Sequence, residues 1–264
     1  MKLNISRDAR PQVRTLLIAT VITLALWFIP YADILTYPFR IFVTFIHEGG
    51  HAIAALLTGN SVASLSVAMN TSGETYTTEG GLISQIFVSS AGYLGAMAYG
   101  ALLLVLIRRA VAARIVLLSS AALILLLTIV YGLWKPLTYG LWGRLSLFTL
   151  VAGALISVGL VAVARYASAR TASFFVSFLA VQCILNALLD LKTVFFLSSP
   201  FGAGVPTDAV NMANATGVPA IFWAIIWVGV ALMILSTAMR VYAVSKHGAS
   251  GKQQDLPFEE PLEV

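Results

Sequence analysis

Long apolar stretches, separated by short polar segments, dominate the chain. A helix needs roughly 20 apolar residues to cross the ~30 Å hydrocarbon core of a bilayer. None of the long stretches alternates apolar and polar residues as a strand does, so all are predicted to be helices. The first follows a basic segment as a signal peptide would, but it is too long for one and no cleavage site follows. Seven helices are therefore expected, at about residues 15–35, 38–57, 81–107, 112–133, 145–164, 171–197 and 221–244.

Three polar interruptions divide this pattern. Residues Asn60–Gly81 are rich in Ser and Thr and partly alternate, with Gly73 midway, which predicts a β-hairpin. An ordinary loop is the alternative for that segment. Lys135–Arg144 is expected to be a short loop, and Ser198–Gly217 a longer one.

The longer loop could cover a site as a lid, with Asp208 and Asn211 as polar contacts. The predicted fold is an all-α polytopic membrane protein of six to seven hydrophobic helices, with a short β-hairpin after the second. It forms one domain over residues 1–246, followed by a polar tail at 247–264.

Composition supports a membrane protein and excludes several other classes. The chain of 264 residues is 59% hydrophobic and only 10% charged, whereas soluble domains carry about 25% charged residues. The net charge of +5 does not indicate nucleic-acid binding, because the basic residues cluster at the ends of apolar segments, where they anchor a membrane protein. The single cysteine, Cys183, excludes an internal disulfide and a multi-cysteine metal site.

Counting Lys and Arg in the connections leaves the topology open. With seven crossings and the N-terminus inside, six basic residues fall inside and nine outside, which contradicts the positive-inside rule. If segment 38–57 does not complete a crossing, twelve fall inside and only Arg40, Lys135 and Arg144 outside. This six-crossing arrangement fits the charges better and places residues 60–81 outside.

The sequence His47-Glu48-Gly49-Gly50-His51 lies within the second apolar stretch. A helix brings residues four apart onto one face, so His47 and His51 can bind one ion while Glu48 reaches a water molecule on it. This is the pattern of two zinc ligands and a general base. Ionisable residues inside a membrane span are costly and indicate a functional site. The alternative is a pair of buried histidines hydrogen-bonded to their neighbours.

Catalytic zinc usually has three protein ligands and a water. Asp190 lies deep in an apolar segment and is our prediction for the third ligand. Lys192 is only two residues away and points to another side of the helix. Asn186, one turn before Asp190, could bind substrate or hold Asp190, or it could form a helix–helix hydrogen bond. His247 lies in the polar tail and is not expected to be a ligand.

These residues resemble the site-2 protease group of intramembrane zinc metallopeptidases, in particular its compact bacterial branch. The likeness rests on the membrane-embedded HEGGH, the hairpin after it and the later Leu189-Asp190, over about residues 40–110 and 175–195. The family motif Asn-x-x-Pro-x-x-x-Leu-Asp-Gly is matched in part, because Gln182, Leu185 and Leu191 replace its Asn, Pro and Gly. Its Ala-Gly-Pro-Leu segment resembles Ser89–Met97, with Tyr93 for the proline.

The resemblance implies one zinc ion per chain and hydrolysis of membrane-spanning or membrane-associated protein segments. It implies a multi-pass protein of a prokaryotic cell membrane, whose partners are the lipid bilayer and a membrane protein or peptide substrate. It also implies that the hairpin, through Val62–Val67 and Thr75–Thr78, offers a strand edge to an unwound substrate. The family usually turns this region to the cytosol. Two other functions stay open: a catalytically silent zinc protein that regulates or binds a client, and a small transporter.

Overall fold

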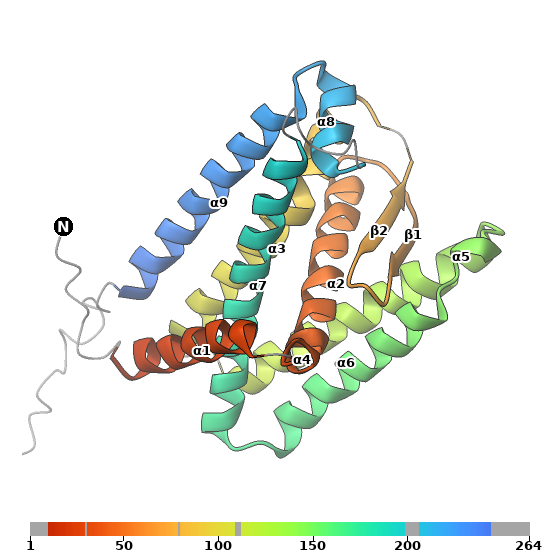
Figure 1. The fold of residues 1–264 in the computed structure, drawn as a ribbon. Helices are drawn as coiled ribbons and strands as arrows, with labels where there is room; N and C mark the ends of the chain where they lie inside the picture. Colours follow the sequence, from red (N-terminus) through yellow and green to blue (C-terminus); the bar gives the residue numbers. More distant parts are fainter. Residues whose placement is uncertain (1–9, 30, 79, 109–111, 199–205, 244–264) are drawn as a thin grey trace, which may run out of the picture.

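The computed structural model describes residues 10–29, 31–78, 80–108, 112–198 and 206–243. The predicted tail at 247–264 lies outside them, so the division into one domain and a tail stays a prediction. The described chain is a bundle of helices with one small antiparallel hairpin (Figure 1), as the sequence predicts. Its elements are α1 (Arg10–Phe28), α2 (Asp33–Leu57), β1 (Val62–Val67), β2 (Gly73–Thr77), α3 (Leu82–Arg108), α4 (Ala113–Leu127), a π-helical stretch (Thr128–Trp134), α5 (Lys135–Thr138), a 3₁₀ turn (Trp142–Arg144), α6 (Leu147–Tyr166), α7 (Ala169–Leu197), α8 (Asp208–Thr216) and α9 (Ala220–Ala243).

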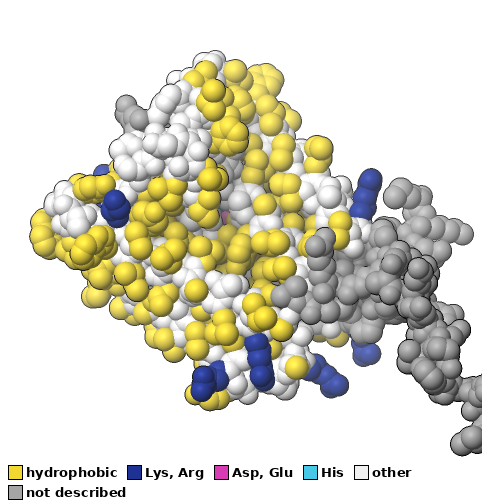
Figure 2. Space-filling model, turned by 180° about the vertical axis from the view of Figure 1, so that it is seen from behind, with side chains coloured by type: hydrophobic (Ala, Val, Ile, Leu, Met, Phe, Trp, Pro, Cys, Tyr) yellow, Lys and Arg dark blue, Asp and Glu magenta, His cyan; other side chains and the backbone are white. Residues whose placement is uncertain are grey.

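Five helical segments are long and apolar enough to cross a membrane. Hydrophobic side chains are spread over the surface of the bundle (Figure 2), as expected for a protein surrounded by lipid. A shorter apolar helix, Val13–Leu26, lies within α1, while α2 carries the HEGGH sequence and packs along α3. The polytopic helical prediction is therefore confirmed, with five candidate spans at Leu82–Ile107, Ala113–Thr138, Leu147–Tyr166, Ala169–Leu197 and Ala220–Val241.

Helices α2 and α3 approach each other closely because glycines lie at their contact. A Cβ atom added to Gly50 would overlap the backbone carbonyl of Ala91. A Cβ atom added to Gly95 would lie 3.4 Å from the Cα atom of Gly50. Small residues let the backbones of membrane helices approach in this way, and the contact fixes where the HEGGH residues of α2 lie relative to α3.

The hairpin packs against α2 and the π-helical stretch, with its first strand buried and its turn exposed. β1 is buried at both faces, with Val62, Leu65 and Val67 each 1% exposed. Its outer edge is bonded to α6, since the Val67 N–H donates to Thr149 Oγ1 at 2.9 Å and that hydroxyl donates back to the Val67 carbonyl at 3.0 Å. β1 has the predicted bounds, and β2 begins two residues earlier than predicted, at Gly73.

The hairpin turn is fastened to α2 by three side chains. The Tyr37 hydroxyl donates to the Met69 carbonyl at 2.8 Å. The Arg40 guanidinium donates to Thr71 Oγ1 at 3.0 Å, and Thr44 Oγ1 donates to the Thr71 carbonyl at 2.8 Å. These bonds hold β2 alongside the helix that carries His47 and Glu48.

The prediction of a loop over Ser198–Gly217 is wrong in part, because it contains helix α8. Thr207 caps the helix, with its side chain accepting from the Val210 N–H, and Gly217 ends it at φ 73°. A Thr cap and a left-handed glycine are standard helix boundaries. The signal is visible in the sequence, but the polar composition of the segment favoured a loop.

We expect Gly50→Ala to destabilise the fold, because the added methyl group has no space against Ala91. Overpacking of this kind costs about 1–3 kcal/mol, so thermal unfolding in detergent should occur at a lower temperature than in the wild type. Gly229→Ala in α9 is the matched control, since a Cβ atom there meets nothing within 4 Å. Equal unfolding temperatures for the two variants would contradict the close contact of α2 and α3.

Candidate metal centre

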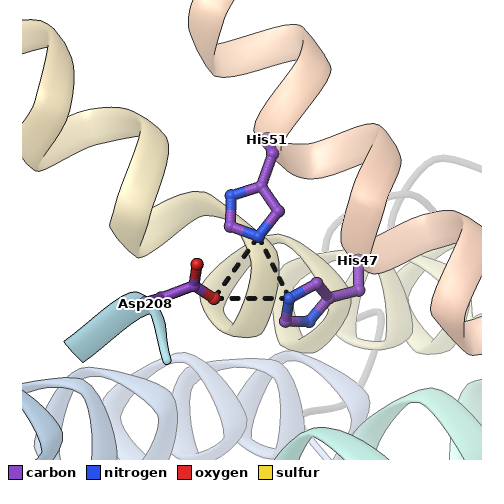
Figure 3. A group of neighbouring side chains, drawn as sticks. All are labelled: His47, His51 and Asp208. Atoms are coloured by element: carbon purple, nitrogen blue, oxygen red, sulfur yellow. Dashed lines mark hydrogen bonds and ion pairs between the residues drawn. The ribbon is translucent and has the colours of Figure 1, made fainter. Parts of the chain in front are cut away.

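Three side chains from two distant segments converge at one point (Figure 3). His47 and His51 project from one face of α2, as their spacing predicts, and Asp208 comes from the first turn of α8. The Nε2 atoms of the histidines are 3.1 Å apart. Asp208 Oδ2 lies 3.6 Å from His47 Nε2 and 3.4 Å from His51 Nε2.

This triangle has the size expected of three zinc ligands. Zinc binds nitrogen and oxygen at about 2.0–2.1 Å in a tetrahedron, which separates any two ligand atoms by about 3.3 Å. Among the residues that the structure describes, His47, His51 and Asp208 form a group whose candidate ligand atoms lie within 4.8 Å of one another. The residues therefore fit a zinc ion.

The surroundings prepare the histidines for a metal. His51 Nδ1 lies 2.6 Å from the Val88 carbonyl, and because a carbonyl only accepts, Nδ1 carries the proton and Nε2 is left with its lone pair. Opposite the pair, Gly92 of α3 has no side chain. A Cβ atom there would overlap both Nε2 atoms, so glycine keeps the space between them open.

The neighbours of Asp208 favour its ionised form. Burial by itself would raise the pKa of its carboxyl group, but protonated His51, and hydrogen bonds from the protonated rings of His47 and His51, hold that pKa below its ordinary value. A bound metal ion would take the place of the protons on the Nε2 atoms. An ionised carboxylate is the form that binds a metal.

Glu48 lies beside the triad and is only 4% exposed. Its Oε2 atom accepts a hydrogen bond of 2.7 Å from the Thr75 hydroxyl of β2. A Cβ atom on Gly73 would overlap the carboxylate, with its nearest contact at Oε1. The hairpin thus orients Glu48 through Thr75 and makes room for it at Gly73.

An aromatic pair supports His47 from the side of α3. The Tyr93 ring meets the His47 ring edge-on, with centroids 4.6 Å apart at 81°. Trp227 of α9 lies against Tyr93 at 5.6 Å, and its Nε1–H donates to Ser90 Oγ at 2.9 Å. Tyr93, which stands at the position of the proline in the family segment, fixes the orientation of the first histidine.

The triad and Glu48 face a cavity of about 1070 Å³. Its walls come from α2, the hairpin and the first half of α3. The last turns of α7 and the first turn of α8 complete them. Ligand pockets commonly measure about 300–1,000 Å³, so an extended peptide segment would fit.

The cavity wall includes a free strand edge. The backbone groups of Val67 bond to Thr149 instead of to Gly73, its partner across the hairpin. Since antiparallel pairs alternate between bonded and non-bonded, Gly73, Thr75 and Thr77 also turn their backbone N–H and C=O groups away from β1. Outside the hairpin itself, the described chain forms no backbone hydrogen bond to these groups.

Comparison with known proteins gives the family of the chain. A family model described as Peptidase M50B-like matches residues 17–238. The chain belongs to this family, which is the site-2 protease family. No curated protein and no solved structure matches the chain. Membership confirms the predicted resemblance and extends it beyond the segments that suggested it.

The structure brings Asp208, and not Asp190, to the histidine pair of this M50B-like protein. Asp190 lies in the cavity wall, but its carboxylate is outside the cluster of candidate ligands. The Asn186 amide donates to the Gln182 carbonyl at 2.8 Å and to Gln182 Oε1 at 3.1 Å, and Gln182 in turn bonds Thr23 of α1. Asn186 therefore takes part in a polar link between α7 and α1.

Sequence reasoning did not assign Asp208 as a ligand, because it stands in a polar segment where a carboxylate needs no special explanation. Asp190 is instead the ligand that the sequence predicts, because a carboxylate in an apolar helix is costly and calls for a partner. The signal for Asp208 was its place in the first turn of a capped helix, which can bring a carboxylate over a site.

The two aspartates can be separated by metal content. We expect purified protein to hold close to one zinc ion per chain, and Asp208→Asn to lose most of it because one of three ligands is weakened. Asp190→Asn, the matched control, should retain zinc. Mass spectrometry of the purified proteins measures the zinc content of both variants. Loss of zinc in Asp190→Asn with retention in Asp208→Asn would reverse the assignment.

Proposed function

We propose that the protein is a zinc-dependent intramembrane endopeptidase that cleaves membrane-spanning or membrane-associated protein segments. The observation that carries this proposal is the convergence of His47, His51 and Asp208 at ligand separations beside Glu48. Membership of a peptidase family gives the reaction class.

His47, His51 and Asp208 would hold the zinc ion. When bound there, zinc supplies a Lewis acid that polarises a carbonyl group and makes water acidic. His51 is fixed for this task by Val88, and His47 by the ring of Tyr93. Ligand orientation by such outer contacts is typical of zinc sites.

Glu48 would act as general base and then as general acid. It would take a proton from the attacking water and deliver it to the leaving amine. Its carboxylate is buried and already accepts a hydrogen bond from Thr75, which limits its rotation. A purely structural zinc site has no use for a carboxylate held in this position, which favours an enzyme over a catalytically silent protein.

The free edge of β2 would bind the substrate. A peptide bond within a helix is shielded by the helical hydrogen bonds, so the substrate must be extended before water can attack. An extended segment could add to Gly73, Thr75 and Thr77 as a further strand, which is a common form of peptide recognition. Because Thr75 also bonds Glu48, a strand paired there would lie directly beside the proposed base.

Asp190 and Asn186 would have auxiliary roles in this proposal. Asp190 lies in the cavity wall on α7 and could contact a bound substrate. Asn186, one turn earlier, would keep this part of α7 in place through Gln182.

Glu48→Gln tests the chemistry without removing a ligand. We expect it to retain zinc and to abolish cleavage of membrane peptides, because an amide cannot accept the proton. Peptide fragments from membranes of cells that carry wild-type protein or Glu48→Gln are compared by mass spectrometry. Zinc content and expression of the variant are the controls. Identical fragments in both cells would refute the protease and leave a silent zinc protein.

A further inference from the structure

The cavity lies at one end of the membrane-spanning bundle. That end also carries the hairpin, α8 and the stretch between α5 and α6 (Figure 1). Because successive spans run in opposite directions, the ends of α3, α6 and α9 and the starts of α4 and α7 lie at the other end. A hydrogen bond of 3.4 Å from Arg114 to the Ala167 carbonyl joins two of these connections.

Basic residues are concentrated at the end away from the cavity. Several Lys and Arg side chains line the lower edge of the molecule in Figure 2, and others lie at its left and right edges. The connections at the cavity end contain two basic residues, Lys135 and Arg144, beside α5. Residues 58–81 and 198–219 contain no Lys or Arg. Arg40 and Lys192 lie within the helices α2 and α7 and are not part of a connection. At the other end, the described residues beside the five candidate spans include Arg108, Arg114, Arg165, Arg170 and Arg240.

The two basic residues at the cavity end have local partners. Lys135 donates to the Tyr139 hydroxyl at 3.2 Å and lies 5.0 Å from the centre of that ring. Arg144 lies 3.9 Å from the Glu74 carboxylate and over the ring of Tyr76. Arg114, Arg165 and Arg170 are exposed and form no ion pair with the described acidic residues. Their charges are therefore not balanced by a described carboxylate.

We infer that the cavity opens on the side of the membrane away from the cytoplasm. An excess of Lys and Arg marks the cytoplasmic loops of membrane proteins, and here that excess lies opposite the cavity. The count uses only the connections of α3, α4, α6, α7 and α9, so it does not depend on whether α1 and α2 cross.

Together with the proposed protease function, on which this step rests, the orientation indicates a class of substrate. The substrate would be a membrane protein whose segment in the outer half of the bilayer unfolds into the cavity. It would differ from the cytosol-facing arrangement that the resemblance to the site-2 protease group implies.

Single cysteines test the orientation. In a Cys183→Ser background, Asn214→Cys places a thiol on the exposed face of α8, and Ala169→Cys places one at the exposed start of α7. A maleimide that does not cross membranes is added to intact cells. We expect Asn214→Cys to be labelled and Ala169→Cys to be labelled only after the membrane is permeabilised.

The opposite labelling, or labelling of both thiols in intact cells, would overturn the inference. A second measurement needs no substitution and covers variants that fail to fold. The wild-type chain carries at its C-terminus either a fluorescent protein or an alkaline phosphatase that is active only outside the cytoplasm. Fluorescence without phosphatase activity is expected, and phosphatase activity would refute the orientation.

These readouts need neither zinc nor proteolysis, so the orientation and the proposed function can fail separately. If labelling agrees and Glu48→Gln leaves the fragments unchanged, only the protease is refuted. If Glu48→Gln abolishes cleavage but Asn214→Cys is labelled only in permeabilised cells, the protease stands and the orientation is wrong.

Discussion

The close contact of α2 with α3 is the constraint on which the rest of the site depends. Gly50 lies against the Ala91 carbonyl, and Gly92 leaves open the space between the two histidine Nε2 atoms. In the same region the Val88 carbonyl accepts a hydrogen bond from His51 Nδ1, and the Tyr93 ring packs against that of His47. A wider separation of the two helices would remove the packing and the hydrogen bond that orient the candidate ligands.

The hairpin is the second fixed component. Its turn is bonded to α2 through Tyr37, Arg40 and Thr44, and its outer strand is bonded to α6 through Thr149. The turn is thus held by α2 and β1 by α6. The edge of β2 that faces away from β1 lies beside Glu48. Thr75 serves the strand and the proposed base together, so that substrate binding and proton transfer would be aligned by one residue.

Much of this arrangement could be predicted from periodicity. Apolar runs of span length predict the helices, and the partly alternating segment Asn60–Gly81 predicts the hairpin that contains β1 and β2. The polar run before α9 was less informative, because composition favours a loop there while a Thr cap and a left-handed glycine enclose helix α8. The topology conflict could not be resolved by counting charges alone, since the count depended on whether segment 38–57 crosses. The directions of the five spans after the hairpin remove that dependence.

The sequence by itself determined the chemistry of one half of the site. Because a helix repeats every 3.6 residues, His47, Glu48 and His51 must share a region of α2. The partner of the pair was decided by tertiary structure. Asp190 and Asp208 are both far from the histidines along the chain, and no local rule says which one reaches them. Asp208 does so because α8 sits at the end of the bundle where α2 and α3 present the histidines, while Asp190 is held in the wall of the cavity by its place on α7.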